Sequence, residues 1–302
     1  MTKQALEIII EHLLNYWPEH GRFIDKMKNS FFEKEMTHHL AHSIYQLVNG
    51  DIDPLVKGYR WMCEMMLEEE LYFRRNGTYR LSSFSQTDAL VYQNAELMTR
   101  YMDGLLLSQV LWPNHLKVFD FYRHEFLVAV KTAKRHLEVG PGHGLLLHYT
   151  AQALKASLEG WDISPSSLEK TAACLRNLGS DARVKLVSRD ITVPHSDDLQ
   201  CFDSLVISEV LEHLEDPASA LHSLCMHALP DAKIFINVPV NSPSIDHIFL
   251  FKTPEEVIEL IESVGLKIEN TCLAPASGLS EVAARKAKTT ISCAVIASVP
   301  VY

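Results

Sequence analysis

His136-Leu-Glu-Val-Gly-Pro-Gly-His-Gly144 is the stretch of sequence that decides the fold. An apolar segment runs through Glu138 into three glycines with the spacing G-x-G-x-G, and the run from Leu145 to Leu154 that follows has the composition of a helix. Because glycine has no Cβ and tolerates unusual backbone angles, such a loop lets the backbone approach a ligand closely. The helix N-terminus behind the loop offers free N–H groups and a positive dipole end to an anion.

The segments after this loop repeat the same order of strand and helix. The next predicted strands are Ser157–Asp162, Val184–Ser188, Phe202–Ser208 and Lys233–Val238. Such alternation favours a parallel sheet whose ligand lies at the carboxyl ends of the strands. The second strand ends at Asp162, and an ionised carboxylate there suits two ribose hydroxyls, since it accepts two hydrogen bonds. A dinucleotide site fits less well, because it requires G-x-G-x-x-G and this loop has G-x-G-x-G.

Four features in this order carry a resemblance to a known family. They are the E-x-G-x-G-x-G loop that starts at Glu138, the turn Asp162-Ile-Ser-Pro165, the acid Asp190 after the third strand, and the run Glu209-Val-Leu-Glu-His213. Over residues 130–300 the chain resembles the class I S-adenosylmethionine (SAM)-dependent methyltransferases. Its E-H-x-x-D-P segment is similar to that of the small-molecule enzymes of the ubiquinone-biosynthesis type.

The resemblance implies an α/β fold. We expect a Rossmann-like class I methyltransferase sheet, mostly parallel with its last strand antiparallel, preceded by a mainly helical N-terminal domain. Leu266–Cys272 and Thr290–Ser298 would supply the last strand pair, and Lys252-Thr253-Pro254 would begin a capped helix before it.

The same resemblance implies which residues bind SAM. The glycine loop would wrap the methionine and ribose parts, Asp162 would bind the ribose hydroxyls, and Asp190 would accept from the adenine amino group. Asp190 also suits an ordinary turn, a position that aspartate fills readily. Glu138 would help to hold the loop and, often through water, the methionine amino group. The predicted cofactor-binding residues are Glu138, Gly140, Pro141, Gly142, Gly144, Asp162, Ile163, Asp190, Ile191, Ser208 and Glu209.

Histidines and aromatic residues are the candidates for catalysis. In this family the histidine at His213 is sometimes catalytic and sometimes structural, and a histidine can act as a base near neutral pH. His247 follows Asp246 in a polar loop that commonly forms one wall of the acceptor pocket, with an exposed loop as the plain alternative. Tyr92 and Tyr101 would present aromatic faces to the SAM sulfonium. Most aromatic residues of the two helices predicted at 88–111 and 114–131 are expected to pack between the helical and the SAM-binding domain.

The chain is predicted to divide into a helical cap or dimerisation domain at 1–130 and a SAM-binding catalytic domain at 131–302. Side chains alternate over residues 71–81 around Asn76-Gly77, a pattern typical of a two-residue hairpin. A helix followed by such a hairpin resembles the winged-helix domain of many small-molecule O-methyltransferases, where it serves dimerisation and active-site coverage. The resemblance implies a possible homodimer through residues 1–80.

Composition argues against several other classes of protein. The 302 residues carry a net charge of −10, whereas binding of nucleic-acid phosphates needs clustered Lys and Arg. The sequence shows no signal peptide and no apolar run of transmembrane length, so we expect a cytoplasmic protein without a membrane partner. The six cysteines form no C-x-x-C pair. Glu212, His213, Glu215 and Asp216 are expected on different faces of one turn, so no metal site is predicted.

Two functions on this scaffold are left open. The first is a methyltransferase that acts on a small molecule, in specialised metabolism, by direct in-line transfer, which needs orientation and desolvation more than acid–base chemistry. The second is a SAM cyclase, in which the amine of SAM attacks its own Cγ and gives azetidine-2-carboxylate and methylthioadenosine. Cavity size discriminates between them, because a cyclase needs room for SAM only. A DNA-binding regulator built on the predicted hairpin is a third and weaker hypothesis.

Overall fold

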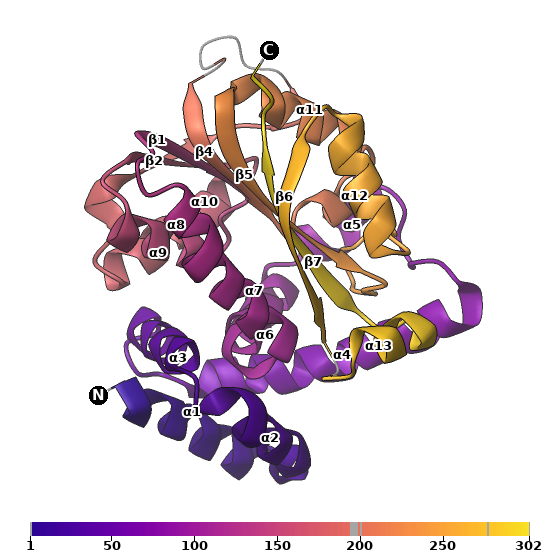
Figure 1. Cartoon of the computed structure of the whole chain (residues 1–302). Helices are drawn as coiled ribbons and strands as arrows, with labels where there is room; N and C mark the ends of the chain where they lie inside the picture. The colour runs from indigo at the N-terminus through magenta and orange to yellow at the C-terminus, as the bar shows by residue number, and fades with distance from the viewer. Residues whose placement is uncertain (1, 194–198, 200, 277, 302) are drawn as a thin grey trace.

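A sheet with helices on both faces forms the centre of the molecule (Figure 1). The computed structural model describes residues 2–193, 199, 201–276 and 278–301. Within these residues one seven-stranded sheet has the order β3-β2-β1-β4-β5-β7-β6. Its strands are β1 (Arg135–Val139), β2 (Ser157–Asp162), β3 (Val184–Ser188), β4 (Phe202–Ser208), β5 (Ala228–Val240), β6 (Lys267–Pro275) and β7 (Ile291–Ser298). Neighbouring strands pair in parallel except β7, which is antiparallel to β5 and β6. The predicted fold class is therefore confirmed.

The two faces of the sheet bury two different hydrophobic cores. On β4, Leu205 and Ile207 belong to one core and Val206 to the other, because successive side chains of a strand point to opposite faces. One core includes residues of α11, α12 and α13, and the other includes residues of α9 and of the first half of the chain. The helices of the second half are α9 (Leu145–Ala153), α10 (Pro165–Asn177), α11 (Pro217–His227), α12 (Pro254–Ser263) and α13 (Glu281–Ala287), with the 3₁₀ turns η5 (Asp181–Arg183) and η7 (Leu211–His213).

Side-chain caps set the starts of three of these helices. Ser164, Asp216 and Thr253 each accept a hydrogen bond from the backbone N–H three residues later, at α10, α11 and α12. A proline follows each cap at the first helical position, where its missing N–H costs nothing. The capped helix predicted at Thr253 is confirmed.

The first half of the chain is helical, as predicted. Its helices are α1 (Thr2–Tyr16), α2 (Gly21–Met27), α3 (Glu35–Leu47), α4 (Asp53–Asn76), α5 (Phe84–Thr87), α6 (Ala95–Leu111), α7 (Pro113–Phe121) and α8 (Leu127–Ala129), with short turns η1 (Pro18–His20), η2 (Lys28–Phe32), η3 (Asp88–Tyr92) and η4 (Tyr122–Phe126). None of the helices in the described part of the chain is both long enough and apolar enough to cross a membrane.

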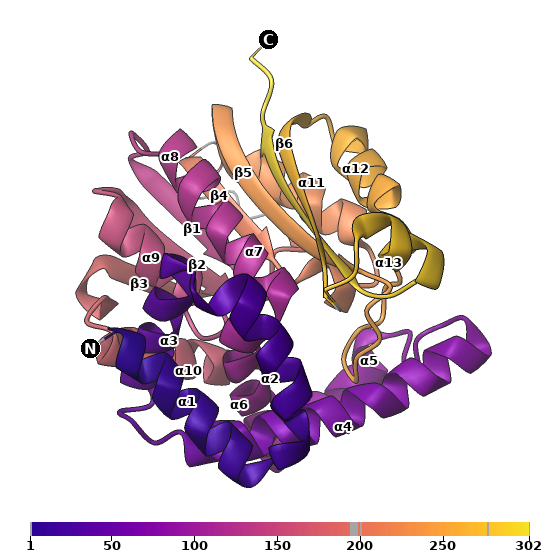
Figure 2. The same cartoon turned by 60° about the horizontal axis from the view of Figure 1, so that its bottom comes forward.

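Two glycines bring α4 and α6 into close contact. A Cβ at Gly58 would lie 2.7 Å from the carbonyl oxygen of Arg100, and a Cβ at Gly104 would lie 2.8 Å from Cβ of Met62. Real Cβ atoms do not approach this closely, so any larger residue would push the two helices apart. Figure 2 shows α4 running along the side of the molecule where α6 lies, with α1 beside it.

An aromatic cluster joins the first half of the chain to the sheet. Phe235 of β5 is fully buried, and its ring lies 4.9 Å from the ring of Tyr122 and 5.4 Å from that of Phe126. The Tyr122 hydroxyl also lies 2.6 Å from Thr150 Oγ1 of α9. One continuous core thus extends from α1 to this face of the sheet. The predicted domain boundary at residue 130 stays a prediction.

The predicted hairpin at residues 71–81 is wrong. Helix α4 continues to Asn76, and Gly77 ends it in the left-handed conformation with φ of +73°. The N–H of Gly77 donates to the carbonyl of Phe73, as in a common helix C-terminus. An Asn-Gly pair suits both a hairpin turn and a helix end, because both need a residue with positive φ. The predicted resemblance to a winged-helix domain rested on this hairpin as the wing, so the resemblance loses that feature.

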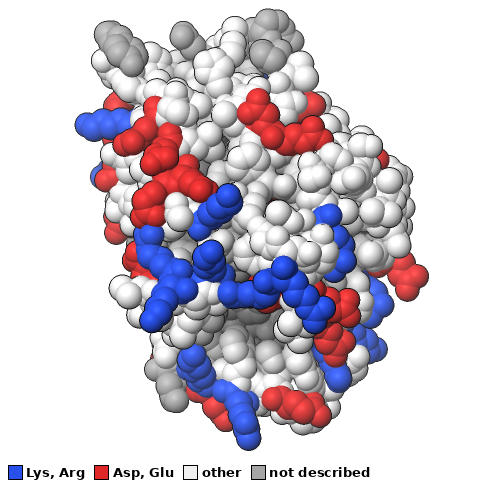
Figure 3. Space-filling model, turned by 90° about the vertical axis from the view of Figure 1, so that its right-hand side faces the viewer, with Lys and Arg blue, Asp and Glu red and all other residues white. Residues whose placement is uncertain are grey.

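The end of α4 instead contacts α13. Arg74 donates hydrogen bonds to the carbonyls of Ala287 and Lys288 at the C-terminus of α13, where the helix dipole favours a cation. Figure 3 shows the face on which α4 and α13 end, and there Lys and Arg side chains gather in a band between groups of Asp and Glu. The negative net charge of the chain is therefore unevenly distributed on its surface.

The aromatic cluster leads to a stability prediction. We expect Phe235→Ala to lower the free energy of unfolding by about 3–5 kcal/mol, because it removes a large buried side chain and leaves a cavity between the helices and the sheet. Phe249→Ala is the matched control, since Phe249 is 36% exposed. Urea unfolding measures both, and equal losses in the two variants would contradict the shared core.

Candidate functional site

A cavity of about 1650 Å³ lies at the carboxyl ends of the central strands. The ends of β1, β2 and β4 line it from the sheet side, and α4, α6 and α7 contribute residues from the helical half. A site at this edge of a parallel sheet agrees with the general rule for open α/β folds. Of the predicted site residues, all except Gly144 line this cavity.

The glycine loop adopts a conformation that requires glycine. Gly140, Gly142 and Gly144 have φ of +66°, +52° and +70°. A Cβ at Gly140 would lie 2.5 Å from Cγ2 of Val210, so that glycine also serves packing, whereas a Cβ at Gly142 would have no atom within 4 Å. The carbonyl of Gly142 accepts a 2.6 Å hydrogen bond from Thr171 Oγ1, which holds the loop on α10. Gly142 is therefore the glycine that leaves free space at the cavity.

Glu138 is a buried acid at the end of β1. Its side chain is 3% exposed, and its Oε2 has no hydrogen-bond partner among the described residues. Burial raises the pKa of Glu138 well above its ordinary range. An unpartnered buried carboxyl oxygen is costly, and a cationic or hydrogen-donating ligand in the cavity would satisfy it.

The two acids after β2 and β3 also hold local turns. Asp162 Oδ1 accepts a 2.8 Å hydrogen bond from the N–H of Ser164, and burial raises the pKa of Asp162. Asp190 Oδ1 accepts from the backbone and hydroxyl of Thr192 at 2.8 and 2.7 Å, which is the turn role left open by the sequence. Ile163 beside Asp162 is 54% exposed although it is apolar, so it offers a surface for a flat ring.

Glu209 directly after β4 is held in an unusual backbone conformation. Its φ is +54°, which is uncommon for a residue with a side chain and is typical of functional positions. Asn237 of β5 donates to Glu209 Oε1 at 2.8 Å and to Ser208 Oγ at 3.1 Å. Burial raises the pKa of Glu209 to about 7. Sequence reasoning missed Asn237, although an amide within the apolar run of β5 was a possible signal.

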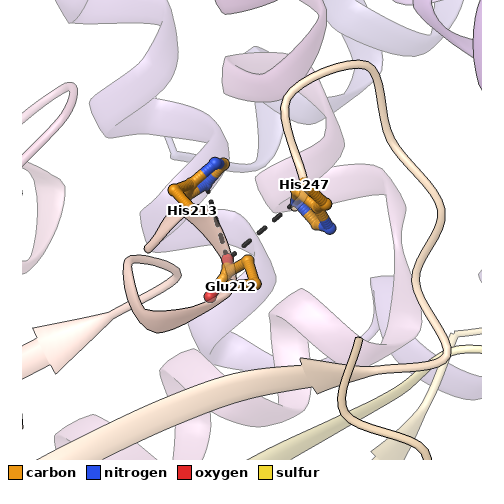
Figure 4. Close-up of side chains that lie close together, drawn as sticks. All are labelled: Glu212, His213 and His247. Atoms are coloured by element: carbon orange, nitrogen blue, oxygen red, sulfur yellow. Dashed lines mark ion pairs between the residues drawn. The ribbon is translucent and has the colours of Figure 1, made fainter. Parts of the chain in front are cut away.

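Glu212, His213 and His247 come together in the cavity wall (Figure 4). Glu212 Oε1 lies 3.6 Å from His213 Nε2 and 4.0 Å from His247 Nε2. Burial, followed by the charge of Glu209, raises the pKa of Glu212, whereas burial lowers the pKa of His247 to about 4. No metal site was predicted from the sequence, because Glu212, His213, Glu215 and Asp216 were expected on different faces of one turn. Among the described residues, these three offer ligand atoms within 4.8 Å of one another.

The two tyrosines occupy different positions. The Tyr92 hydroxyl lies 3.3 Å from His213 Nδ1, beside the histidine pair. The Tyr101 hydroxyl donates to Asp246 Oδ1 at 2.9 Å and lies 2.7 Å from Ser244 Oγ, so it anchors the loop that carries His247. Both residues line the cavity, and the hydroxyl of Tyr101 is already engaged in this buried network.

The buried acids predict a pH-dependent stability. A carboxyl whose pKa rises on folding holds its proton more tightly in the folded state, so its contribution to stability is lost as pH rises from 4.5 towards 7. Between pH 5 and pH 8 we expect the native chain to lose on the order of 2 kcal/mol relative to Glu209→Gln. Urea unfolding at both pH values measures this, with the exposed-site variant Glu262→Gln as control. A pH dependence equal in both variants would refute it.

Comparison with known proteins gives the family. Residues 115–280, more than half of the chain, match the family described as a methyltransferase domain. A ubiquinone biosynthesis O-methyltransferase of Alkalilimnicola ehrlichii is 31% identical over 130 residues, which are 42% of this chain and 50% of that protein. One of Neisseria meningitidis is 27% identical over 132 residues, 42% of this chain and 53% of that protein. The chain thus spans about half the length of the curated relatives that it matches.

Two solved structures have the same fold. A putative sarcosine dimethylglycine methyltransferase from Galdieria sulphuraria has a TM-score of 0.50 and 13% identity, over 61% of this chain and 87% of that chain. The [4+2]-cyclase SpnF has a TM-score of 0.50 and 14% identity, over 63% of this chain and 83% of that chain. At such identities the likeness concerns the fold alone. The family match, together with the glycine loop and the sheet order, shows that the chain belongs to the methyltransferase-domain family.

Proposed function

We propose that the protein transfers a methyl group from SAM to a small-molecule acceptor. The observation that carries this proposal is one cavity whose lining has two chemically different parts. The first part consists of the glycine loop, Glu138 and Asp162, and the second part consists of His213 and His247. The volume of about 1650 Å³ exceeds the ~300–1,000 Å³ usual for one small ligand, so it leaves space for an acceptor beside SAM.

The chemistry of the first part suits SAM. The unpartnered oxygen of Glu138 would accept a hydrogen bond from the ammonium group of the methionine moiety. Asp162 would accept from the ribose hydroxyls, and the exposed side chain of Ile163 would cover one face of the adenine. Asp190 and Ile191 line the same cavity and would contact the adenine from the next strand end.

The reaction moves one methyl group and one proton. The acceptor's nucleophilic atom attacks the methyl carbon in line with the sulfur, the carbon–sulfur bond breaks, and its electron pair stays on sulfur to give S-adenosylhomocysteine. The acceptor loses a proton as the new bond forms. What the protein supplies is orientation of the two reactants and exclusion of water, which can account for several orders of magnitude in rate.

His213 and His247 support an acceptor with a hydroxyl group at the second part of the cavity. The relatives' names, O-methyltransferases, agree with this choice of atom. Apolar side chains from the helical half, including Phe23, Cys63 and Trp112, line a further part of the cavity and suit an apolar body attached to that hydroxyl. The placement in specialised metabolism stays a prediction.

The first test concerns the glycine loop. Gly142→Ala and Gly179→Ala both place a Cβ at positive φ in open space, so both should lose about 1 kcal/mol of stability through backbone strain. Of these two glycines, Gly142 lines the cavity and Gly179 does not. We expect Gly142→Ala alone to weaken SAM binding, by on the order of tenfold or 1.4 kcal/mol, measured by calorimetry. Equal affinities in the two variants would contradict a role of the loop in SAM binding.

The second test separates methyl transfer from cyclisation. Purified protein is incubated with SAM alone, and the products are followed by mass spectrometry. We expect SAM to be bound but to stay intact, because the acceptor is absent. Appearance of methylthioadenosine with azetidine-2-carboxylate would identify a SAM cyclase and refute the proposed methyl transfer.

A further inference from the structure

The group Glu212, His213 and His247 joins two segments that are distant in sequence. Glu212 and His213 lie in η7, directly after β4, and His247 lies in the loop after β5. The carbonyl of Glu212 accepts hydrogen bonds from the N–H groups of Ile248 and Phe249 at 3.0 and 2.9 Å. These two bonds fix the loop on the turn. The three side chains are therefore held in one arrangement by the backbone (Figure 4).

Both imidazole rings direct the same nitrogen towards Glu212. Nδ1 of His247 donates to the carbonyl of Ser242 at 2.7 Å, and Nδ1 of His213 donates to the carbonyl of Asp246 at 3.0 Å. With the proton on Nδ1, each Nε2 keeps its lone pair, and each Nε2 faces Glu212 Oε1. A backbone carbonyl on the far nitrogen is the usual orienting contact of a histidine that binds a metal.

Glu212 itself lacks a partner. The residue is fully buried, and neither carboxyl oxygen has a hydrogen-bond partner among the described residues. The distances of 3.6 and 4.0 Å to the imidazole nitrogens exceed those of a charge-assisted hydrogen bond, about 2.7–2.9 Å. Such a buried carboxyl without a partner is costly unless a ligand completes it.

We propose that Glu212, His213 and His247 bind a divalent transition-metal ion such as Zn²⁺. Two imidazoles and one carboxylate suit zinc, manganese or iron(II) better than magnesium, which prefers oxygen ligands. Ligand distances of about 2.0–2.2 Å around one ion place the ligand atoms somewhat over 3 Å apart. The nitrogen–oxygen distances of 3.6 and 4.0 Å therefore need only small side-chain movements to close on an ion.

The proposed metal site adds a step to the proposed methyl transfer, and the chemical role of the ion depends on that proposed function. Three protein ligands leave a coordination position open, and all three residues line the cavity. There the ion would hold the acceptor's hydroxyl oxygen and make it more acidic, as metal ions do with bound water. The hydroxyl proton leaves to water in the cavity, and the oxygen then attacks the methyl carbon of SAM. His213 and His247 act as ligands in this scheme rather than as bases.

The test uses Co²⁺ as a spectroscopic probe on the full-length protein after removal of metals with a chelator. We expect one Co²⁺ to bind with visible absorption bands of a tetrahedral or five-coordinate site, and Zn²⁺ to displace it. Glu212→Gln and His247→Gln should each weaken Co²⁺ binding at least about tenfold. His222→Gln and Glu262→Gln, at exposed positions, should bind Co²⁺ as the native chain does.

Two controls make the outcome decisive. Thermal unfolding of each variant shows that it is folded, and calorimetry with SAM on the metal-free protein tests the proposed function separately. Absence of Co²⁺ bands in the native chain, or unchanged bands in folded Glu212→Gln and His247→Gln, overturns the metal site. If SAM binds under those conditions, the proposed methyl transfer still stands; if Co²⁺ binds at this site but SAM does not, the proposed function fails and the metal site remains.

Discussion

The packing of Phe235 against Tyr122 and Phe126 is the contact on which the rest of the structure depends. It fixes α7 and η4 on one face of the sheet, and the chain on either side of them then has little freedom. Helix α6 ends directly before α7, and the glycine contact between α6 and α4 brings α4 to the same side. As a result, the helices stand over the carboxyl ends of β1, β2 and β4. The cavity is the space that this arrangement leaves.

Buried carboxyl groups give this cavity its chemical character. Glu138, Glu209 and Glu212 follow or end strands at the centre of the sheet, and burial raises the pKa of all three. Burial of an ionised carboxyl is costly against a net stability of about 5–15 kcal/mol, and a cationic ligand would offset that cost. Each of the proposed ligands at these acids is cationic at the point of contact: the ammonium group of SAM at Glu138, and a metal ion at Glu212. The same physical constraint therefore explains both proposals.

Local signals in the sequence were reliable where one conformation alone fits them. The glycine loop needs positive φ at three alternate positions, which glycine adopts readily. The order of apolar strands and helices leaves few alternatives to a parallel sheet. The signal at Asn76-Gly77 was misread, because a helix end and a hairpin turn both require a glycine with positive φ. The structure decides between them, because the N–H of Gly77 donates to the carbonyl of Phe73 and so continues the helical hydrogen bonds of α4.

The sequence by itself determined the fold class and the residues at the strand ends that meet at one edge of the sheet. The alternation of strands and helices follows from periodicity and backbone sterics, which act over a few residues, whereas the antiparallel last strand was implied by the family resemblance. The structure decided the order of the strands. Only the tertiary structure decided that His247 lies beside Glu212 and His213, that Asn237 holds Glu209, and that Tyr101 is engaged by Asp246. These contacts join segments that are 28 to 145 residues apart. No local pattern encodes such pairs, because they arise from the way in which neighbouring strands and the helical half pack together.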